Sequence, residues 1–186
     1  VDVAISSDGK LVACVTDNTI RDGHKTTYVN KITVYEATGS VKHELLGHDD
    51  SMTCVLFSPD GLSLISGSRN HSGGEDSTDQ TIRVWNVLTG KQEPKFSDMH
   101  TNCDAIALSG PDSAGQQRLF ASNFIRIRIH YYSTEEKLCT LSHDGNVTCF
   151  SISLDGTRVA SCADTVLSVW DVVDEAYIKK GYTEFK

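Results

Sequence analysis

Residues 47–68 read GHDDSMTCVLFSPDGLSLISGS, and residues 79–90 read DQTIRVWNVLTG. The first stretch holds two apolar runs separated by Ser58-Pro59-Asp60-Gly61. An Asp-Gly pair between two such runs predicts a β-hairpin, because glycine accepts the positive φ that the turn requires. The second stretch adds a third run of the same kind. We therefore expect consecutive antiparallel strands here.

The hairpin pattern recurs along the chain. Residues 3–16 (VAISSDGKLVACVT) and 149–163 (CFSISLDGTRVASCA) repeat the pattern of residues 54–68. A third and a fourth short run follow each time, which gives four strands over roughly 40–50 residues, the spacing of β-propeller blades. Such sheets fold by burying their faces against neighbouring sheets. We expect blades at 1–46, 47–97, 98–141 and 142–180, with the start of a further repeat at 181–186.

Two of these stretches resemble the WD40 repeat closely. Residues 47–90 match that family's pattern nearly end to end, and residues 142–172 are a second good match. The other two repeats are degenerate, with Tyr35 and His130 where the good repeats have tryptophan. The resemblance implies an all-β, WD40-like β-propeller with four blades of four antiparallel strands.

Propellers of this family usually close with more than four blades. We therefore expect residues 1–186 to form a single segment that is an open section of a larger propeller, or half of a ring closed by another chain, as in a homodimer. Otherwise the sheet faces and edges at its two ends would invite pairing. Closure with four blades is a less favoured alternative.

A histidine, a serine, an aspartate and a tryptophan recur at matching positions of the two good repeats. The two sets are His48, Ser66, Asp79 and Trp85, and His143, Ser161, Asp164 and Trp170. His, Ser and Asp could together form a hydrolase triad. Ser66, however, lies within the apolar run LSLISGS and has no G-x-S-x-G motif around it. Active sites also seldom recur once per structural repeat.

The resemblance to WD40 repeats implies that each set forms a hydrogen-bonded structural tetrad. Such a network would satisfy buried polar groups together, so we predict no catalytic residues. The first and third repeats depart from the set and should not build the network. The departing residues are Cys14, Val29 and Tyr35 in the first repeat, and Phe124 and His130 in the third, which keeps His100 and Ser122.

Net charge, apolar content and residue spacing argue against several classes of ligand. The net charge is −8 and the pI is about 5.3, which disfavours nucleic acid as a partner. No apolar run is long enough to span a membrane. The seven histidines lack zinc-ligand spacing, the acidic residues near 75–79 do not match an EF-hand, and SGGEDS (72–77) lacks the lysine and helix of a P-loop. We predict neither a metal nor a cofactor.

The six cysteines lie mostly in apolar runs and form no C-x-x-C motif. This pattern is typical of free, buried cysteines in a reducing compartment. We therefore expect a cytoplasmic protein, with the nucleus as an alternative.

Two long connections, 16–30 and 69–79, should stand side by side on the propeller face that carries the loops between second and third strands, the top face. Loops on a rigid scaffold often carry function, although both could simply be solvated insertions. The candidate partner-binding residues are Arg21, Asp22, His24, Tyr28, Arg69, His71, Glu75 and Asp76.

The function that we expect is a non-catalytic scaffold that binds a protein or peptide on its top face. One alternative is a regulatory or sensor segment of a larger signalling protein, for example a signalling ATPase. A remote alternative is a propeller hydrolase, in which case activity would depend on Ser66.

Overall fold

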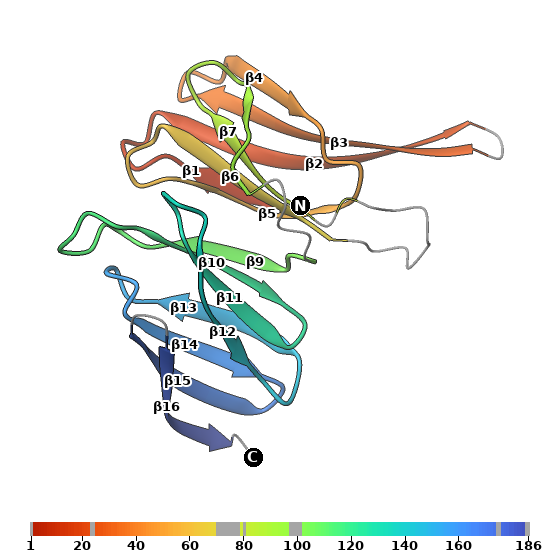
Figure 1. The fold of residues 1–186 in the computed structure, drawn as a ribbon. Coiled ribbons are helices and arrows are strands. Elements are labelled where there is room, and N and C mark those ends of the chain that lie inside the picture. Colours follow the sequence, from red (N-terminus) through yellow and green to blue (C-terminus); the bar gives the residue numbers. More distant parts are fainter. Residues whose placement is uncertain are drawn as a thin grey trace. The chain divides into compact units, whose positions relative to one another are not determined.

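The computed structural model describes residues 2–22, 25–69, 79, 81–96, 102–173 and 176–184, and it describes the side chains of these residues except within 17–29 and 173–184. In this part of the chain every regular element is a β-strand, and the strands form four antiparallel sheets (Figure 1). The chain divides into two compact units, residues 1–104 (unit 1) and 105–186 (unit 2), with two sheets in each.

Unit 1 contains two sheets whose strands pair in sequence order. The first sheet holds β1 (Val3–Ile5), β2 (Leu11–Asp22), β3 (Lys25–Glu36) and β4 (Val41–Leu46). The second holds β5 (Met52–Phe57), β6 (Ser63–Ser68), β7 (Ile82–Asn86) and β8 (Gln92–Glu93). Each sheet is therefore a four-stranded meander, the form of a propeller blade.

Unit 2 repeats this arrangement. Its first sheet holds β9 (Ala105–Leu108), β10 (Arg118–Asn123), β11 (Arg126–Tyr131) and β12 (Lys137–Ser142). Its second holds β13 (Val147–Ile152), β14 (Arg158–Ala163), β15 (Val166–Val173) and β16 (Ala176–Glu184). The predicted all-β fold with four blades of four antiparallel strands is thus confirmed.

One segment differs from the sequence prediction. The described residues of 16–30 do not form a loop, because β2 and β3 continue through them in register as far as the pair Asp22↔Lys25, and Figure 1 shows this hairpin extending beyond its sheet. An Asp-Gly pair at 22–23, between runs rich in Thr, Ile and Val, is the same hairpin signal that marks the other turns. Residues 181–184 lie in β16, and the start of a further repeat at 181–186 stays a prediction.

Within each unit the two sheets share one hydrophobic core. In unit 1, Ala13, Val15, Ile32 and Val34 from the first sheet cluster with residues of the second, among them Leu64. In unit 2, the core residues are Phe120, Ile127, Ile129, Leu138, Cys139, Leu141, Val159, Trp170 and Val172. A four-stranded sheet cannot bury its apolar face alone, so this packing between paired sheets is what stabilises each blade.

The Ser-x-Asp-Gly turns between first and second strands share one hydrogen-bond pattern. The serine Oγ donates to the aspartate Oδ1 at 2.5–2.7 Å in the turns Ser6–Asp8, Ser58–Asp60 and Ser153–Asp155. The same Oγ accepts the backbone N–H five residues later, at 2.9 Å in all three turns. The glycine takes a φ between +67° and +72°, which favours this residue over others.

The third blade keeps this closure across a longer turn. Ser109 Oγ accepts the N–H of Arg118 at 2.9 Å, although nine residues separate them. Within the turn, Asp112 Oδ1 accepts the N–H groups of Ala114 and Gln116. The longer turn at 109–117 is therefore accommodated without loss of the serine contact.

We expect the replacement Ser153→Ala to destabilise the protein in a pH-dependent way. The hydrogen bond from Ser153, followed by those from Thr157, lowers the pKa of Asp155 to about 2, whereas an unfolded aspartate titrates near about 3.9. A lowered pKa contributes stability above the unfolded value, and this contribution is lost as pH falls from about 4 towards about 2. The stability difference between wild type and variant should therefore shrink over that range.

The measurement combines an NMR titration of the Asp155 carboxyl with urea unfolding at several pH values. Replacing the exposed Ser113 by alanine provides a control that should leave the Asp155 titration unchanged. An Asp155 pKa near about 4 in the wild type would contradict the role of the serine.

Candidate functional site

In unit 1, the four predicted tetrad residues are joined into one buried chain of hydrogen bonds. Trp85 Nε1–H donates to Ser66 Oγ at 2.9 Å. Ser66 Oγ lies 2.7 Å from His48 Nε2, and His48 Nδ1 lies 2.9 Å from Asp79 Oδ2. All four residues are at most 5% exposed. Strands β6 and β7 supply Ser66 and Trp85, and the connections before β5 and β7 supply His48 and Asp79.

The two ends of this hydrogen-bonded series, Trp85 and Asp79, determine which group donates at each link. The indole can only donate, and an ionised carboxylate can only accept. His48 Nδ1–H therefore donates to Asp79, which leaves Nε2 as an acceptor for the Ser66 hydroxyl proton. A neutral imidazole satisfies every link, so the network needs no further partner.

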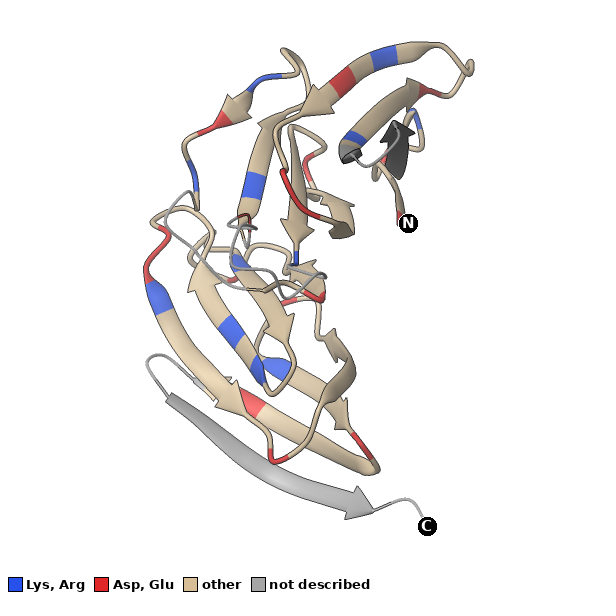
Figure 2. Ribbon diagram, turned by 90° about the vertical axis from the view of Figure 1, so that its right-hand side faces the viewer, with Lys and Arg blue, Asp and Glu red and all other residues tan. Residues whose placement is uncertain are grey.

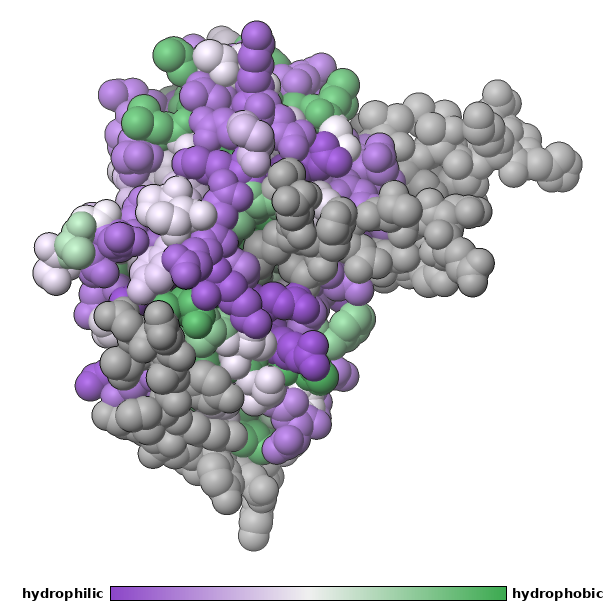
Figure 3. All heavy atoms as spheres, in the orientation of Figure 1, coloured by the Kyte–Doolittle hydropathy of each residue, from purple (hydrophilic) through white to green (hydrophobic). Residues whose placement is uncertain are grey.

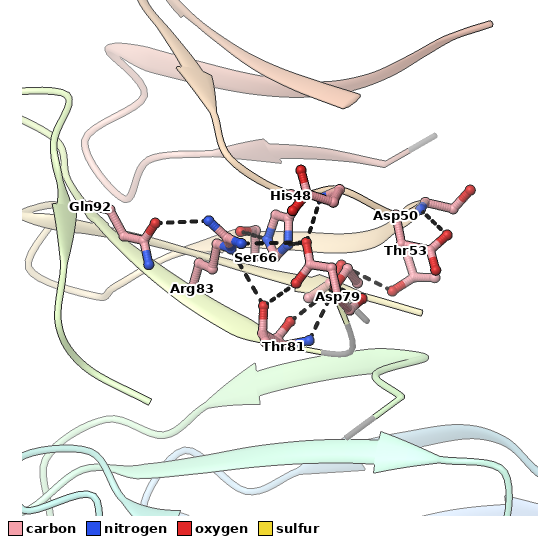
Figure 4. Close-up of polar contacts among 12 residues, drawn as sticks. His48, Asp50, Thr53, Ser66, Asp79, Thr81, Arg83 and Gln92 are labelled. Carbon is pink, nitrogen blue, oxygen red and sulfur yellow. Dashed lines mark hydrogen bonds and ion pairs between the residues drawn. The ribbon is translucent and has the colours of Figure 1, made fainter. Parts of the chain in front are cut away.

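The carboxylate of Asp79 is the anchor of the network. Its side chain is 2% exposed. Burial would raise its pKa, but hydrogen bonds from His48 and Thr81 and from the backbone N–H of Asp49 outweigh burial and hold the pKa well below its usual range. Figure 4 shows this carboxylate between His48 and Thr81, with Arg83 reaching towards it from β7.

Arg83 lies beside the tetrad. Its Nη2 lies 3.6 Å from Asp79 Oδ2, and its Nη1 donates to Gln92 Oε1 at 3.0 Å. Gly47, which precedes His48, has a φ of 152°, a conformation that favours glycine. A Cβ there would also lie 2.5 Å from Arg83 Nη1, so a larger residue would displace this guanidinium.

This geometry does not suit Ser66 for nucleophilic catalysis. Ser66 is fully buried within strand β6. Its oxygen already accepts the Trp85 N–H, and its proton is held by His48. A nucleophile must instead be exposed beside donors that stabilise the oxyanion.

In unit 2, three of the predicted tetrad residues are joined by the same hydrogen bonds as in unit 1. Trp170 Nε1–H donates to Ser161 Oγ at 2.8 Å, and Ser161 Oγ lies 2.7 Å from His143 Nε2. Asp164 departs from the prediction. It is exposed, and its Oδ1 accepts the backbone N–H of Asn146 at 3.3 Å. Among the described residues, Asp164 is not bonded to the histidine.

The length of the preceding connection explains the difference between the two aspartates. Asp79 lies near the end of the long connection between β6 and β7. No tight turn fixes its direction, and its carboxylate contacts His48. Asp164 is the first residue of a two-residue turn between β14 and β15 and has a φ of 50°. Its spacing to the tryptophan is the same in the sequence, but the tight turn directs its carboxylate to the neighbouring segment.

The described tetrad positions of the first and third blades differ as the sequence indicates. Cys14 and Tyr35 are half-buried, and the Val29 side chain lies outside the described part. Ser122 Oγ donates to the carbonyl of Ala105 at 3.4 Å. His130 Nδ1 lies 3.0 Å from the carbonyl of Glu135, and burial lowers the pKa of this histidine. His100 lies outside the described residues.

Of the predicted partner-binding residues, the structure describes the side chain of Arg69. Its Nη1 lies 2.6 Å from Asp104 Oδ1. No sequence pattern marks Asp104 as a partner. The side chains of Arg21, Asp22 and Tyr28, and all of His24, His71, Glu75 and Asp76, lie outside the described part. The predicted binding role of these eight residues stays a prediction.

Unit 2 exposes apolar side chains at one edge. Phe124 and Ile125 form the two-residue turn between β10 and β11 and are 50% and 41% exposed. Their carbonyls accept the N–H groups of Val147 and His143. This turn therefore lies beside the segment 143–147, to which the 164–165 turn is also joined, because the Asp164 N–H donates to the carbonyl of Asn146. We call residues 124–125, 143–146 and 164–165 the loop edge.

A pocket of about 190 Å³ opens at the loop edge. It lies between residues 143–145 and 163–166, with Ser168 below, and two carboxylates, Asp144 and Asp164, line it. No cluster of metal-ligating side chains occurs among the described residues, and none of them form a helix able to cross a membrane.

The two aspartates provide a matched test of the tetrad. Asp79→Asn removes the negative charge and replaces one of the two acceptor oxygens by an NH2 donor, so the contacts of Oδ2 with His48 and Asp49 and of Oδ1 with Thr81 cannot all be kept. We expect it to lower the free energy of unfolding by about 1–3 kcal/mol. Asp164→Asn, at the equivalent but exposed position, should change it by less than about 0.5 kcal/mol. Urea unfolding followed by circular dichroism measures both, and equal effects would contradict the assignment.

Comparisons with known proteins agree with this geometry. The family model "WD domain, G-beta repeat" matches residues 39–86 and 135–171. The chain is 32% identical over 102 residues to an uncharacterized WD repeat-containing protein of Synechocystis, covering 52% of the chain and 22% of that protein. It is 29% identical over 135 residues to a guanine nucleotide-binding protein subunit beta of Zea mays, covering 67% and 33%.

A solved structure supports the fold independently of sequence. A chain in the crystal structure of a mitotic checkpoint complex superposes with a TM-score of 0.66 at 16% identity, covering 97% of this chain and 63% of that one. The chain therefore spans less than two thirds of the length of each of these proteins. The chain therefore contains WD40 repeats at residues 39–86 and 135–171, it is similar to WD repeat proteins, and its sheets have the blade architecture of a β-propeller.

Proposed function

We propose that this chain is a non-catalytic scaffold that binds a protein or peptide, and that the loop edge of unit 2 contributes to the binding surface. The observation that carries the proposal is the contrast between the two kinds of site. The tetrad serines and tryptophans are buried and hydrogen-bonded to one another, and each serine also contacts the histidine of its set. Phe124 and Ile125, by contrast, are exposed beside an open pocket.

The chemistry of the loop edge suits a peptide. Single exposed apolar residues are common, but two adjacent ones beside a concave site offer anchor points for a partner. The face drawn in Figure 3 is mostly hydrophilic over its described residues, with hydrophobic residues in small groups. Asp144 and Asp164 add negative charge in the pocket, which favours a partner with a basic side chain.

The distribution of charge supports a protein partner over nucleic acid. Figure 2 shows Lys and Arg interspersed with Asp and Glu along the described ribbon, and the chain carries a net charge of −8. Nucleic-acid binding depends on a continuous positive surface. Proteins of the WD40 family are generally non-enzymatic interaction scaffolds, and the names of two relatives describe a subunit and a complex.

A peptide selection tests the proposal. Peptides are selected from a random displayed library on the folded chain, and the Kd of each selected peptide is then measured by fluorescence anisotropy. We expect the double variant Phe124→Ser/Ile125→Ser to raise the Kd at least about tenfold for peptides that bind here, because truncating a central anchor commonly costs more than about 1 kcal/mol.

Leu154→Ser is the matched control. Leu154 is the most exposed large apolar residue among the side chains that the structure describes, and it lies in the turn between β13 and β14, at the opposite end of these strands from the loop edge. It should leave the Kd unchanged. A selection whose peptides all bind the double variant as tightly as the wild type would contradict the proposal.

A further inference from the structure

Two cysteines face each other across neighbouring strands of the fourth blade. Cys149 on β13 and Cys162 on β14 are direct Cα partners in the antiparallel ladder. Side chains of such partners have Cβ atoms about 4.5–5.5 Å apart, and a disulfide needs about 3.5–4.5 Å between them. A small adjustment of two paired strands is therefore enough to join the sulfurs.

The pair lies on the sheet face opposite the Ser161 network. Side chains alternate along a strand, so Cys162 points away from the face to which Ser161 and Ala163 contribute. Cys149 is exposed and Cys162 is half-buried. The residues beside them on this face, Ser151 and Ala160, are exposed too. Within residues 1–186, a small reagent can therefore reach Cys149 without disturbing the buried core.

The two thiols are suited to different steps. Burial, and then the neighbouring Cys149, raises the pKa of the Cys162 thiol. Cys162 therefore holds less thiolate at neutral pH, and the thiolate is the nucleophile. Cys139 shows the extreme case, because burial raises its pKa to about 11, although Arg118 and Lys137 oppose the rise. Cys149 is the more exposed of the two thiols, so we expect a reagent to meet it first, and Cys162 is its ladder partner, so it can react next with the Cys149 sulfur.

The second blade offers an internal comparison. Cys54 also follows a threonine on the first strand of its blade, but its ladder partner is Gly67. Cys103 fills the place of the missing side chain, with its Sγ 3.7 Å from Cys54 Sγ. A Cβ at Gly67 would lie 2.6 and 2.7 Å from these two sulfurs. Cys54 and Cys103 are only 6% and 0% exposed, so this pair is shielded from reagents.

We propose that Cys149 and Cys162 form a dithiol site that reacts with low-molecular-weight disulfides. In the first step the Cys149 thiolate attacks one sulfur of the reagent, forms a mixed disulfide and releases one thiolate. In the second step the Cys162 thiolate attacks the Cys149 sulfur, forms the cross-strand disulfide and releases the second thiolate. Two protein thiols are oxidised, and one reagent disulfide is reduced to two thiols.

Oxidised glutathione is the probe that tests this site on the folded chain. Intact-mass spectrometry should show the loss of two hydrogen atoms without a retained glutathione, and peptide mapping should place the new bond between Cys149 and Cys162. Cys162→Ser should stop the reaction at a stable glutathione adduct on Cys149. Cys149→Ser should lose the reaction on this blade.

Cys14→Ser is the matched control, because Cys14 is also partly exposed and lies in another blade. It should leave the cross-strand bond unchanged, and circular dichroism checks that each variant is folded. Three results would overturn the proposal: an adduct that persists on Cys149 in the wild type, no reaction at either cysteine, or a bond between Cys54 and Cys103 that forms first. This site does not depend on peptide binding, so either proposal can fail without the other.

Discussion

The structure of unit 1 depends on how a buried indole N–H is satisfied. Trp85 packs in the core, and its N–H must find an acceptor there because an unpaired buried donor costs about 1–3 kcal/mol. Ser66 accepts it, His48 accepts from Ser66, and Asp79 accepts from His48. Two strands and two connections are thereby fixed to one another. Ser66, His48 and Asp79, which suggest a hydrolase in the sequence, therefore serve to stabilise the fold.

The position that Asp79 occupies in the second blade is buried there but exposed in the third and fourth blades, where it can contact a partner. In the second blade the long connection returns Asp79 to the interior, where it closes the network. In the third and fourth blades the corresponding residues are Phe124 and Asp164, each the first residue of a two-residue turn, and both are exposed. A position that is buried in one blade is therefore exposed in the others. This difference is the reason why we propose a binding surface on unit 2.

Much of the fold follows from patterns that are local in the sequence. The Asp-Gly turns and alternating apolar runs predict the four strands of each blade, because hairpins are specified by adjacent residues. The serine, histidine and tryptophan of both networks were also predictable, since they recur at fixed positions. Asp164 was not, because equal spacing does not reveal whether a connection is long enough to turn a carboxylate inward. The Arg69–Asp104 ion pair and the Cys149–Cys162 pairing depend on tertiary contact and register, which no single motif encodes.

The Trp85 N–H belongs to the hydrogen-bonded network of Ser66, His48 and Asp79. Exchange of the indole N–H protons with D2O, followed by NMR in the native protein, tests this assignment. We expect the Trp85 indole proton to exchange as slowly as the backbone amides of β6 and β7, so that it is released only when these strands open. An indole proton that exchanges at once while those amides stay protected would contradict it.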